Sequence, residues 1–90
     1  MGTARLIPLR DVAVPADRAL QVWTLQDRAQ GPVSVGLIEA ARQSRLDLAP
    51  VPRPTQPDQL FEITLEPRAG SPTGRPTGPV LFKGLASHTL

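Results

Sequence analysis

Proline and glycine set the strongest limit on what this chain can fold into. The sequence contains 11 prolines and 7 glycines among its 90 residues. Proline lacks the N–H that a helix interior needs, and its ring clashes with the preceding turn. Because such residues recur along the whole chain, long helices and a helical bundle are excluded. A chain of this length supports one hydrophobic core, so we expect a single small domain built from short elements.

Six short runs have the β-branched content or the alternation of strands. They cover residues 4–14, 19–25, 33–38, 45–48, 60–66 and 79–85. Pro8 makes the first run an edge strand that bends. Both faces of the second run are apolar, so we expect it at the centre of a sheet, joined as a hairpin to the third run. In that third run, Val33, Val35 and Leu37 are expected to share one face.

The run over residues 60–66 has the cleanest alternation. Its apolar residues are Phe61, Ile63 and Leu65, and its polar residues are Glu62, Thr64 and Glu66. This pattern predicts a half-buried strand whose polar face lies against water. We expect it to pair antiparallel with the run over 79–85 and to share a core with Val80 or Phe82.

The connections between these runs are expected to be irregular. Residues 38–44 predict a loop or one short helical turn, because six or seven residues make a marginal helix. The prolines between residues 50 and 57 favour an extended connection. The tail over residues 86–90 is expected to fray.

Residues 67–79 predict a long surface loop. Apart from prolines they contain no large apolar residue, and they repeat the triplet Pro-Thr-Gly. Proline limits what the unfolded chain can explore, and glycine reaches backbone angles that other residues resist. We therefore expect the loop to lie against the sheet in one conformation, with positive φ at Gly70, Gly74 or Gly78.

Together these features predict an all-β fold. We expect residues 1–90 to form one small antiparallel β-sandwich of six to seven short strands with a long Pro/Gly-rich loop. A partly open barrel is the alternative architecture. Little apolar surface is left over to line a deep pocket.

The residue types needed for most site chemistry are scarce. The chain has no cysteine and one histidine, His88, three residues from the end. This excludes thiol nucleophiles, disulfides and metal sites built from Cys or several His residues. A catalytic base in a frayed tail would not be held in place. We therefore expect no catalytic, cofactor-binding or metal site and no bound cofactor, and we expect the protein not to be an enzyme.

Four other features have an ordinary structural interpretation. Glu62 and Glu66 resemble a carboxylate pair, but on one strand face they are expected to be solvated and well apart. The Gly-Ser-Pro-Thr-Gly segment at 70–74 lacks the lysine and following helix of a phosphate-binding loop. Trp23 is expected in the core, and Arg75 at the loop tip is expected to be solvated.

The charge pattern argues against nucleic acid as a partner. The formal net charge is +2, and only 3% of the residues are aromatic. Basic residues are scattered singly, whereas nucleic-acid sites cluster them and add stacking side chains. The sequence also lacks the roughly 18 or more continuous apolar residues of a membrane span, so this chain is not expected to insert into a membrane.

Three segments together resemble the C-terminal domain of anti-sigma-K factors of the RskA type. That family commonly shows the patterns "aliphatic-Gln-aliphatic-Trp", "GPVS-x-G" and "SLEP-x-GGSP-x-G-x-PTGPVL". The matching segments are Leu20 to Leu25, Gly31 to Leu37 and Ile63 to Gly84. Thr64 stands where serine is common, and Arg68-Ala69-Gly70 stands where Ala-Gly-Gly is common.

The resemblance implies an extracytoplasmic domain of a membrane-anchored regulator. In such proteins a cytoplasmic domain sequesters a sigma factor, one helix crosses the membrane, and a domain like this one lies outside, on the periplasmic face. The implied role is to relay an envelope signal or to gate proteolysis of the regulator. Its partners would be an envelope protease or sensor, with a sigma factor bound by the full-length protein and not by this domain.

Two other function classes stay open at this point. A carbohydrate- or peptide-binding β-sandwich would need an aromatic-lined groove, and a small hydrolase would need clustered carboxylates. With Trp23, Phe61 and Phe82 as the only aromatic residues, neither feature is evident. The inducing signal and the oligomeric state do not follow from the sequence.

Overall fold

The computed structural model describes residues 3–6, 14–38, 44–47, 56 and 58–86. These residues form six strands and, within the described ranges, no helix. The strands are β1 (Thr3–Leu6), β2 (Arg18–Leu25), β3 (Val33–Ile38), β4 (Ser44–Asp47), β5 (Leu60–Pro67) and β6 (Val80–Leu85). The predicted all-β class is confirmed.

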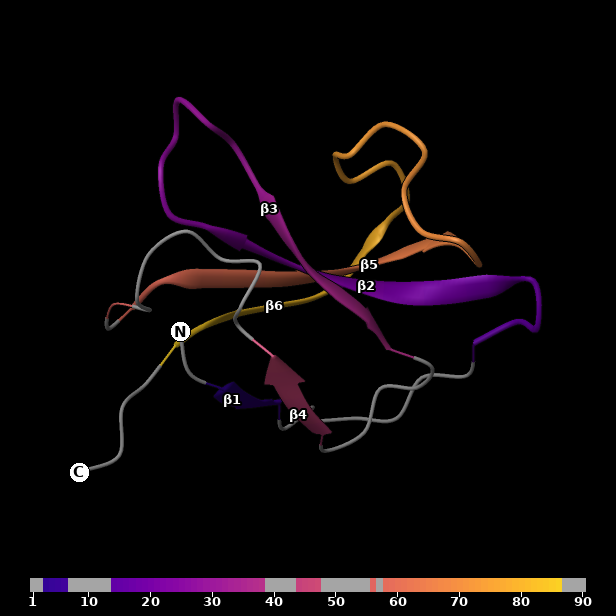
Figure 1. Cartoon of the computed structure of the whole chain (residues 1–90), viewed down its shortest axis with the longest axis horizontal. Helices are drawn as coiled ribbons and strands as arrows, with labels where there is room; N and C mark the ends of the chain where they lie inside the picture. The colour runs from indigo at the N-terminus through magenta and orange to yellow at the C-terminus, as the bar shows by residue number, and fades with distance from the viewer. Residues whose placement is uncertain (1–2, 7–13, 39–43, 48–55, 57, 87–90) are drawn as a thin grey trace.

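The strands form one four-stranded sheet and one two-stranded ribbon (Figure 1). All pairings are antiparallel, with the order β3-β2-β5-β6 in the sheet and β1-β4 in the ribbon. The ribbon lies on one side of the sheet, where β4 contacts β3. The second layer of the predicted sandwich is therefore much smaller than the first.

Strand β2 is central, as its two apolar faces predicted. It pairs with β3 through a hairpin and with β5 along its whole length, from Arg18 opposite Pro67 to Leu25 opposite Leu60. Six consecutive residues of β2, from Ala19 to Thr24, are buried. The predicted antiparallel pairing of β5 with β6 is also confirmed.

The hydrophobic core lies on the face of the sheet that is turned toward the ribbon. Its buried residues are Leu20, Val22, Val35 and Ile63. Phe61, Leu65 and Phe82 pack against this cluster, and Phe82 lies directly opposite Ile63. The predicted shared core of β5 and Phe82 is thus confirmed. Val80, the other residue named for this core, is 48% exposed.

Both edge strands of the sheet contain a β-bulge. On β3 the extra residue is Val35, because Val22 pairs with Gly36 and Trp23 pairs with Ser34. The expectation that Val33, Val35 and Leu37 share a face is wrong, because the bulge turns Leu37 to the other side, where it is 46% exposed. On β6 the extra residue is Leu81, since Ile63 pairs with Phe82 and Thr64 with Val80.

Some expectations concern residues outside the described ranges. These are the bend after the first strand, the turn over 39–43, the proline-rich connection over 48–55, and the tail with His88. Within the described ranges, the first run is a short strand that pairs with β4 in the ribbon and is not part of the main sheet.

Candidate functional site

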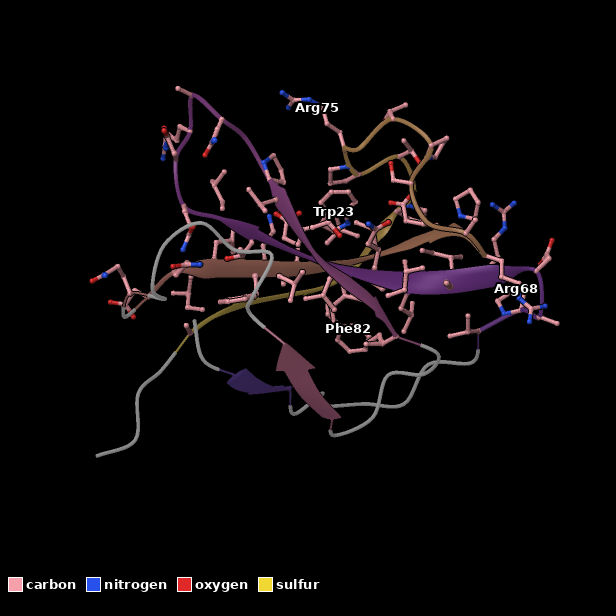
Figure 2. All side chains as sticks on the ribbon, in the orientation of Figure 1. Trp23, Arg68, Arg75 and Phe82 are labelled. Atoms are coloured by element: carbon pink, nitrogen blue, oxygen red, sulfur yellow. The ribbon has the colours of Figure 1, made fainter. Side chains whose placement is uncertain are left out.

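The second face of the four-stranded sheet is covered by the connection between β5 and β6. We call residues 68–79 the β5–β6 loop. Figure 2 shows Trp23 on the loop side of the sheet and Phe82 on the opposite, core side. The residues of this second face alternate with the core residues along β2 and β5, as the strand period of two requires.

Glu66 is the main attachment point of the loop. Its side chain is completely buried. The carboxylate accepts hydrogen bonds from the backbone N–H of Thr77 at 3.0 Å and of Gly78 at 3.2 Å, and from the hydroxyl groups of Thr77 and Thr64. The buried charge is therefore stabilised by four dipoles, three of which belong to the loop.

This geometry contradicts the expectation that the polar face of the strand lies against water. Thr64 and Glu66 are both fully buried, and only Glu62 of the three polar residues is partly exposed. The reason is the loop, which folds back over this face and supplies the donors that water would otherwise supply. Glu62 instead lies 3.7 Å from the ammonium group of Lys83.

Trp23 is joined to Glu66 by a hydroxyl group. The indole N–H of Trp23 donates to Oγ1 of Thr64 at 2.9 Å, and that hydroxyl donates in turn to Glu66. Trp23 is 1% exposed, which confirms the predicted buried position. Serine, common at position 64 in the family pattern, would offer the same hydroxyl. In this conformation the only tryptophan cannot serve as a stacking platform for a ligand.

Gln21 holds the other end of the loop. Its Oε1 atom accepts the backbone N–H of Ser71 at 2.8 Å, and its Nε2 atom donates to Oγ of Ser34 at 2.8 Å. This single side chain on β2 therefore joins the loop to the edge strand β3. A polar residue in a strand of apolar neighbours was the sequence signal for this role, which sequence reasoning missed.

The tip of the loop is stabilised by its own hydroxyl groups. The carbonyl of Arg75 accepts hydrogen bonds from the hydroxyls of Ser71 and Thr73, and the N–H of Arg75 donates to Thr73 at 3.2 Å. Gly70 and Gly74 have φ of 98° and 76°. These contacts confirm the prediction of a defined loop laid on the sheet, with two of the three named glycines at positive φ.

Gly78 is required for a different reason from the one predicted. Its φ is not positive, but a Cβ atom added there would lie 1.6 Å from the carbonyl oxygen of Leu65. The backbone of the loop thus lies directly on β5 at this point. The N–H of Leu65 also donates to the carbonyl of Pro79 at 3.1 Å, which continues the contact.

Arg75 reaches from the loop to the turn between β2 and β3. A Cβ atom added at Gly31 would lie 2.8 Å from Nη1 of Arg75, so the guanidinium group covers this glycine. Figure 2 shows the side chain extending away from the loop. Arg75 is exposed, as expected at the loop tip, and its guanidinium group in addition lies against Gly31.

The electrostatics of the site centre on Glu66. Burial by itself would raise the pKa of this carboxyl, but the hydrogen bonds from Thr64, Thr77 and Gly78 outweigh it and hold the pKa below its ordinary value. Glu66 is therefore ionised at neutral pH. All of its described contacts are hydrogen bonds from neutral groups, and the described residues provide no ion-pair partner for it.

Within the described part of the chain, no three His, Cys, Asp or Glu side chains come together as a group that could hold a metal ion. Among the same residues there is also no helix long and apolar enough to cross a membrane.

These contacts describe a small β domain in which one sheet face is closed by its own loop through two hydrogen-bond networks, one around Gln21 and one around Glu66. Both networks join segments that carry the family resemblance. Gln21 of the first segment bonds to Ser34 of the second and Ser71 of the third, and Trp23 of the first is joined through Thr64 to Glu66 and Thr77 of the third. Residues 1–80 match the family described as "Anti-sigma-K factor rskA, C-terminal".

Since this match covers most of the chain, the protein belongs to that family. The family is regulatory rather than catalytic, and its name implies interaction with a sigma factor. Anti-sigma factors of this family suggest a membrane-associated protein. Searches of curated proteins and of solved structures gave no match.

Proposed function

We propose that residues 1–90 form the extracytoplasmic regulatory domain of a membrane-anchored anti-sigma factor. In this proposal the domain is not catalytic. It receives an envelope signal, or gates proteolysis of the regulator, and so determines when a sigma factor is released on the other side of the membrane. Its direct partners are an envelope protease or sensor. The match of residues 1–80 to the anti-sigma-K family carries this proposal.

The geometry of the covered face supports a regulatory role. A loop of twelve residues is attached to the sheet through two side chains, Gln21 and Glu66, which accept hydrogen bonds from its backbone N–H groups. In this proposal the loop has two states, the closed one seen in the structure and an open one in which these hydrogen bonds are broken. A regulator needs an element of this kind, because a signal acts by favouring one of two states over the other.

The orientation can be tested with fusions in the complete regulator. Alkaline phosphatase placed behind Leu90 is expected to be active, because this enzyme folds only outside the cytoplasm. β-Galactosidase at the same position is expected to be inactive. The opposite pair of results would place the domain in the cytoplasm and would contradict the proposal.

The regulatory role can be tested with a reporter gene that depends on the cognate sigma factor. The substitution Glu66→Ala in the complete regulator removes the acceptor of the loop hydrogen bonds. It is expected to change expression of the reporter gene while synthesis of the regulator stays the same. Glu62→Ala is the matched control, since it removes a carboxylate from the same strand face and leaves the loop contacts in place. Equal expression with both variants would argue against a role of this face in signalling.

A further inference from the structure

We propose that Glu66 is an acid-sensitive latch, so that protonation of its carboxylate releases the Thr77–Gly78 end of the β5–β6 loop and uncovers Trp23 while the sheet stays folded. This inference concerns the domain itself and holds whether or not the domain serves an anti-sigma factor. It is based on the three hydrogen bonds that Thr77 and Gly78 of the loop donate to the buried Glu66 carboxylate.

The two oxygen atoms of the Glu66 carboxylate accept different numbers of hydrogen bonds. Oε2 accepts three hydrogen bonds, from the Thr64 hydroxyl and from the N–H groups of Thr77 and Gly78, and Oε1 accepts one from the Thr77 hydroxyl. Hydrogen bonds to a charged acceptor are stronger than those to a neutral one. A proton on Glu66 therefore weakens all four contacts together.

The other attachment of the loop does not respond to pH. Gln21 holds Ser71 with neutral groups, and the loop tip is closed by the hydroxyls of Ser71 and Thr73. We therefore expect the loop to open at its C-terminal end and to stay tethered at residue 71. The strand pairs of β2 and β5 use backbone groups and are likewise independent of Glu66.

The described charged groups on the elements around Glu66 do not form ion pairs with it. They are Arg18 at the start of β2, Glu62 on β5, Lys83 on β6, and Arg68 and Arg75 in the loop. Lys83 pairs with Glu62, the Arg75 guanidinium lies against Gly31, and Arg18 and Arg68 are exposed. Among the described residues none of these charges pairs with Glu66, so no neighbouring ion compensates when it is protonated.

The direction of the effect follows from the lowered pKa of Glu66 in the closed state. The ionised carboxylate stabilises the closed loop. This stabilisation is complete at pH values above 4.5, the ordinary pKa of a glutamate, and it is lost as the pH falls through the lower pKa that Glu66 has in the closed state. Closed is therefore the state at neutral pH, and release occurs on acidification below 4.5.

Trp23 provides a built-in reporter of this step. It is the only tryptophan, it is 1% exposed, and its indole N–H is held by the hydroxyl that also donates to Glu66. Opening of the loop brings water to the indole. Acrylamide quenching of its fluorescence should therefore rise when the latch opens.

The test is an acid titration of the 90-residue chain by fluorescence quenching and by amide hydrogen exchange. Quenching of Trp23 and loss of protection at Thr77 and Gly78 are expected to share one midpoint below pH 4.5. The loss of protection at these amides should be about tenfold or more, as weakening of charge-assisted hydrogen bonds implies. The strand amides of Val22 and Ile63 should stay protected at that pH.

Two pairs of variants separate the latch from general acid unfolding. Glu66→Gln mimics the protonated state and should open the loop at neutral pH without a titration, whereas Glu62→Gln should titrate like the wild type. Thr77→Ala removes one hydrogen bond to the charged form, so its midpoint should move to higher pH, and Thr77→Ser should not shift. Thr77 is exposed, so both of its variants are expected to fold.

Two results would overturn the proposal. One is that Trp23, Thr77, Gly78 and the strand amides all change at a single pH, which would mean that the domain only unfolds as a whole. The other is that Thr77→Ala titrates with the midpoint of Thr77→Ser, which would mean that the loop is not held by the carboxylate.

Discussion

At the scale of single residues, Glu66 organises the covered face. It joins a strand residue, Thr64, to two loop residues that lie 11 and 12 positions further along the chain. A buried carboxylate is tolerated because each of its oxygen atoms is occupied by donors. Truncating it removes the acceptor from the buried Thr64 hydroxyl and from three part-buried loop donors.

Glu66→Ala is therefore expected to lower the free energy of unfolding by about 3 kcal/mol, because the buried Thr64 hydroxyl and three part-buried loop donors lose a charged acceptor at once. Urea denaturation followed by circular dichroism measures this change. Glu62→Ala is the control, and it should cost less than about 0.5 kcal/mol, since its partner Lys83 is exposed. Similar losses for the two variants would show that Glu66 has no special role in stability.

Gly78→Ala tests the close contact between the loop and β5. The new Cβ atom would lie 1.6 Å from the carbonyl oxygen of Leu65, so the loop must move. We expect a destabilisation of about 3 kcal/mol or more, at the upper end of overpacking effects.

Gly84→Ala is the matched control for this substitution, because its Cβ would meet nothing within 4 Å and its φ is not positive. It should be neutral or slightly stabilising in a thermal melt. An unchanged melting temperature for Gly78→Ala would mean that the loop does not lie on the strand.

Among the strands, β5 makes different contacts on its two faces. One face contributes Ile63 to the core, and the other contributes Thr64 and Glu66 to the polar network. The alternation of residues 60–66 was sufficient to predict the strand and its apolar face. It could not predict what covers the polar face, because the donors come from a loop whose path depends on tertiary structure.

Ile63→Ala is expected to destabilise the domain by about 2 to 5 kcal/mol, since a 3% exposed side chain leaves a cavity when it is truncated. Val80→Ala, on the neighbouring strand and 48% exposed, should have a much smaller effect. Chemical denaturation of both variants gives the comparison. A loss below about half a kcal/mol for Ile63→Ala would contradict the assigned core.

The β-bulges and the β1–β4 pair show the limits of sequence reasoning at this scale. The extra residues Val35 and Leu81 lie in runs with ordinary strand composition, so nothing in the alternation marks them. β1 and β4 are far apart in the chain, and each is only four residues long. Pairing of such short segments is decided by packing and not by local preference.

At the scale of the whole molecule, the all-β class, the central strand and the long ordered loop could all be predicted from the sequence. The relative size of the two layers could not, because it depends on which strands pair. The polar network was also missed, since polar residues on a strand ordinarily indicate a solvated face. The family resemblance provided the motifs, and the structure shows that they meet in two hydrogen-bond networks between the sheet and the loop.

The whole molecule also carries little charge for binding nucleic acid. With a net charge of +2 and Trp23 buried, we expect only weak and salt-sensitive association with DNA or RNA. Fluorescence anisotropy with a labelled oligonucleotide measures it. A tight complex at physiological salt would contradict this expectation.

The β5–β6 loop closes one face of the sheet, and Trp23, Thr64 and Glu66 form the contact that holds it there. Hydrogen exchange of the Trp23 indole N–H at neutral pH tests it most directly, because the chain has a single indole and hence a single signal. We predict exchange slowed by about a hundredfold or more relative to a free indole, as for a buried and hydrogen-bonded group. Exchange at the rate of a free indole would contradict the claim.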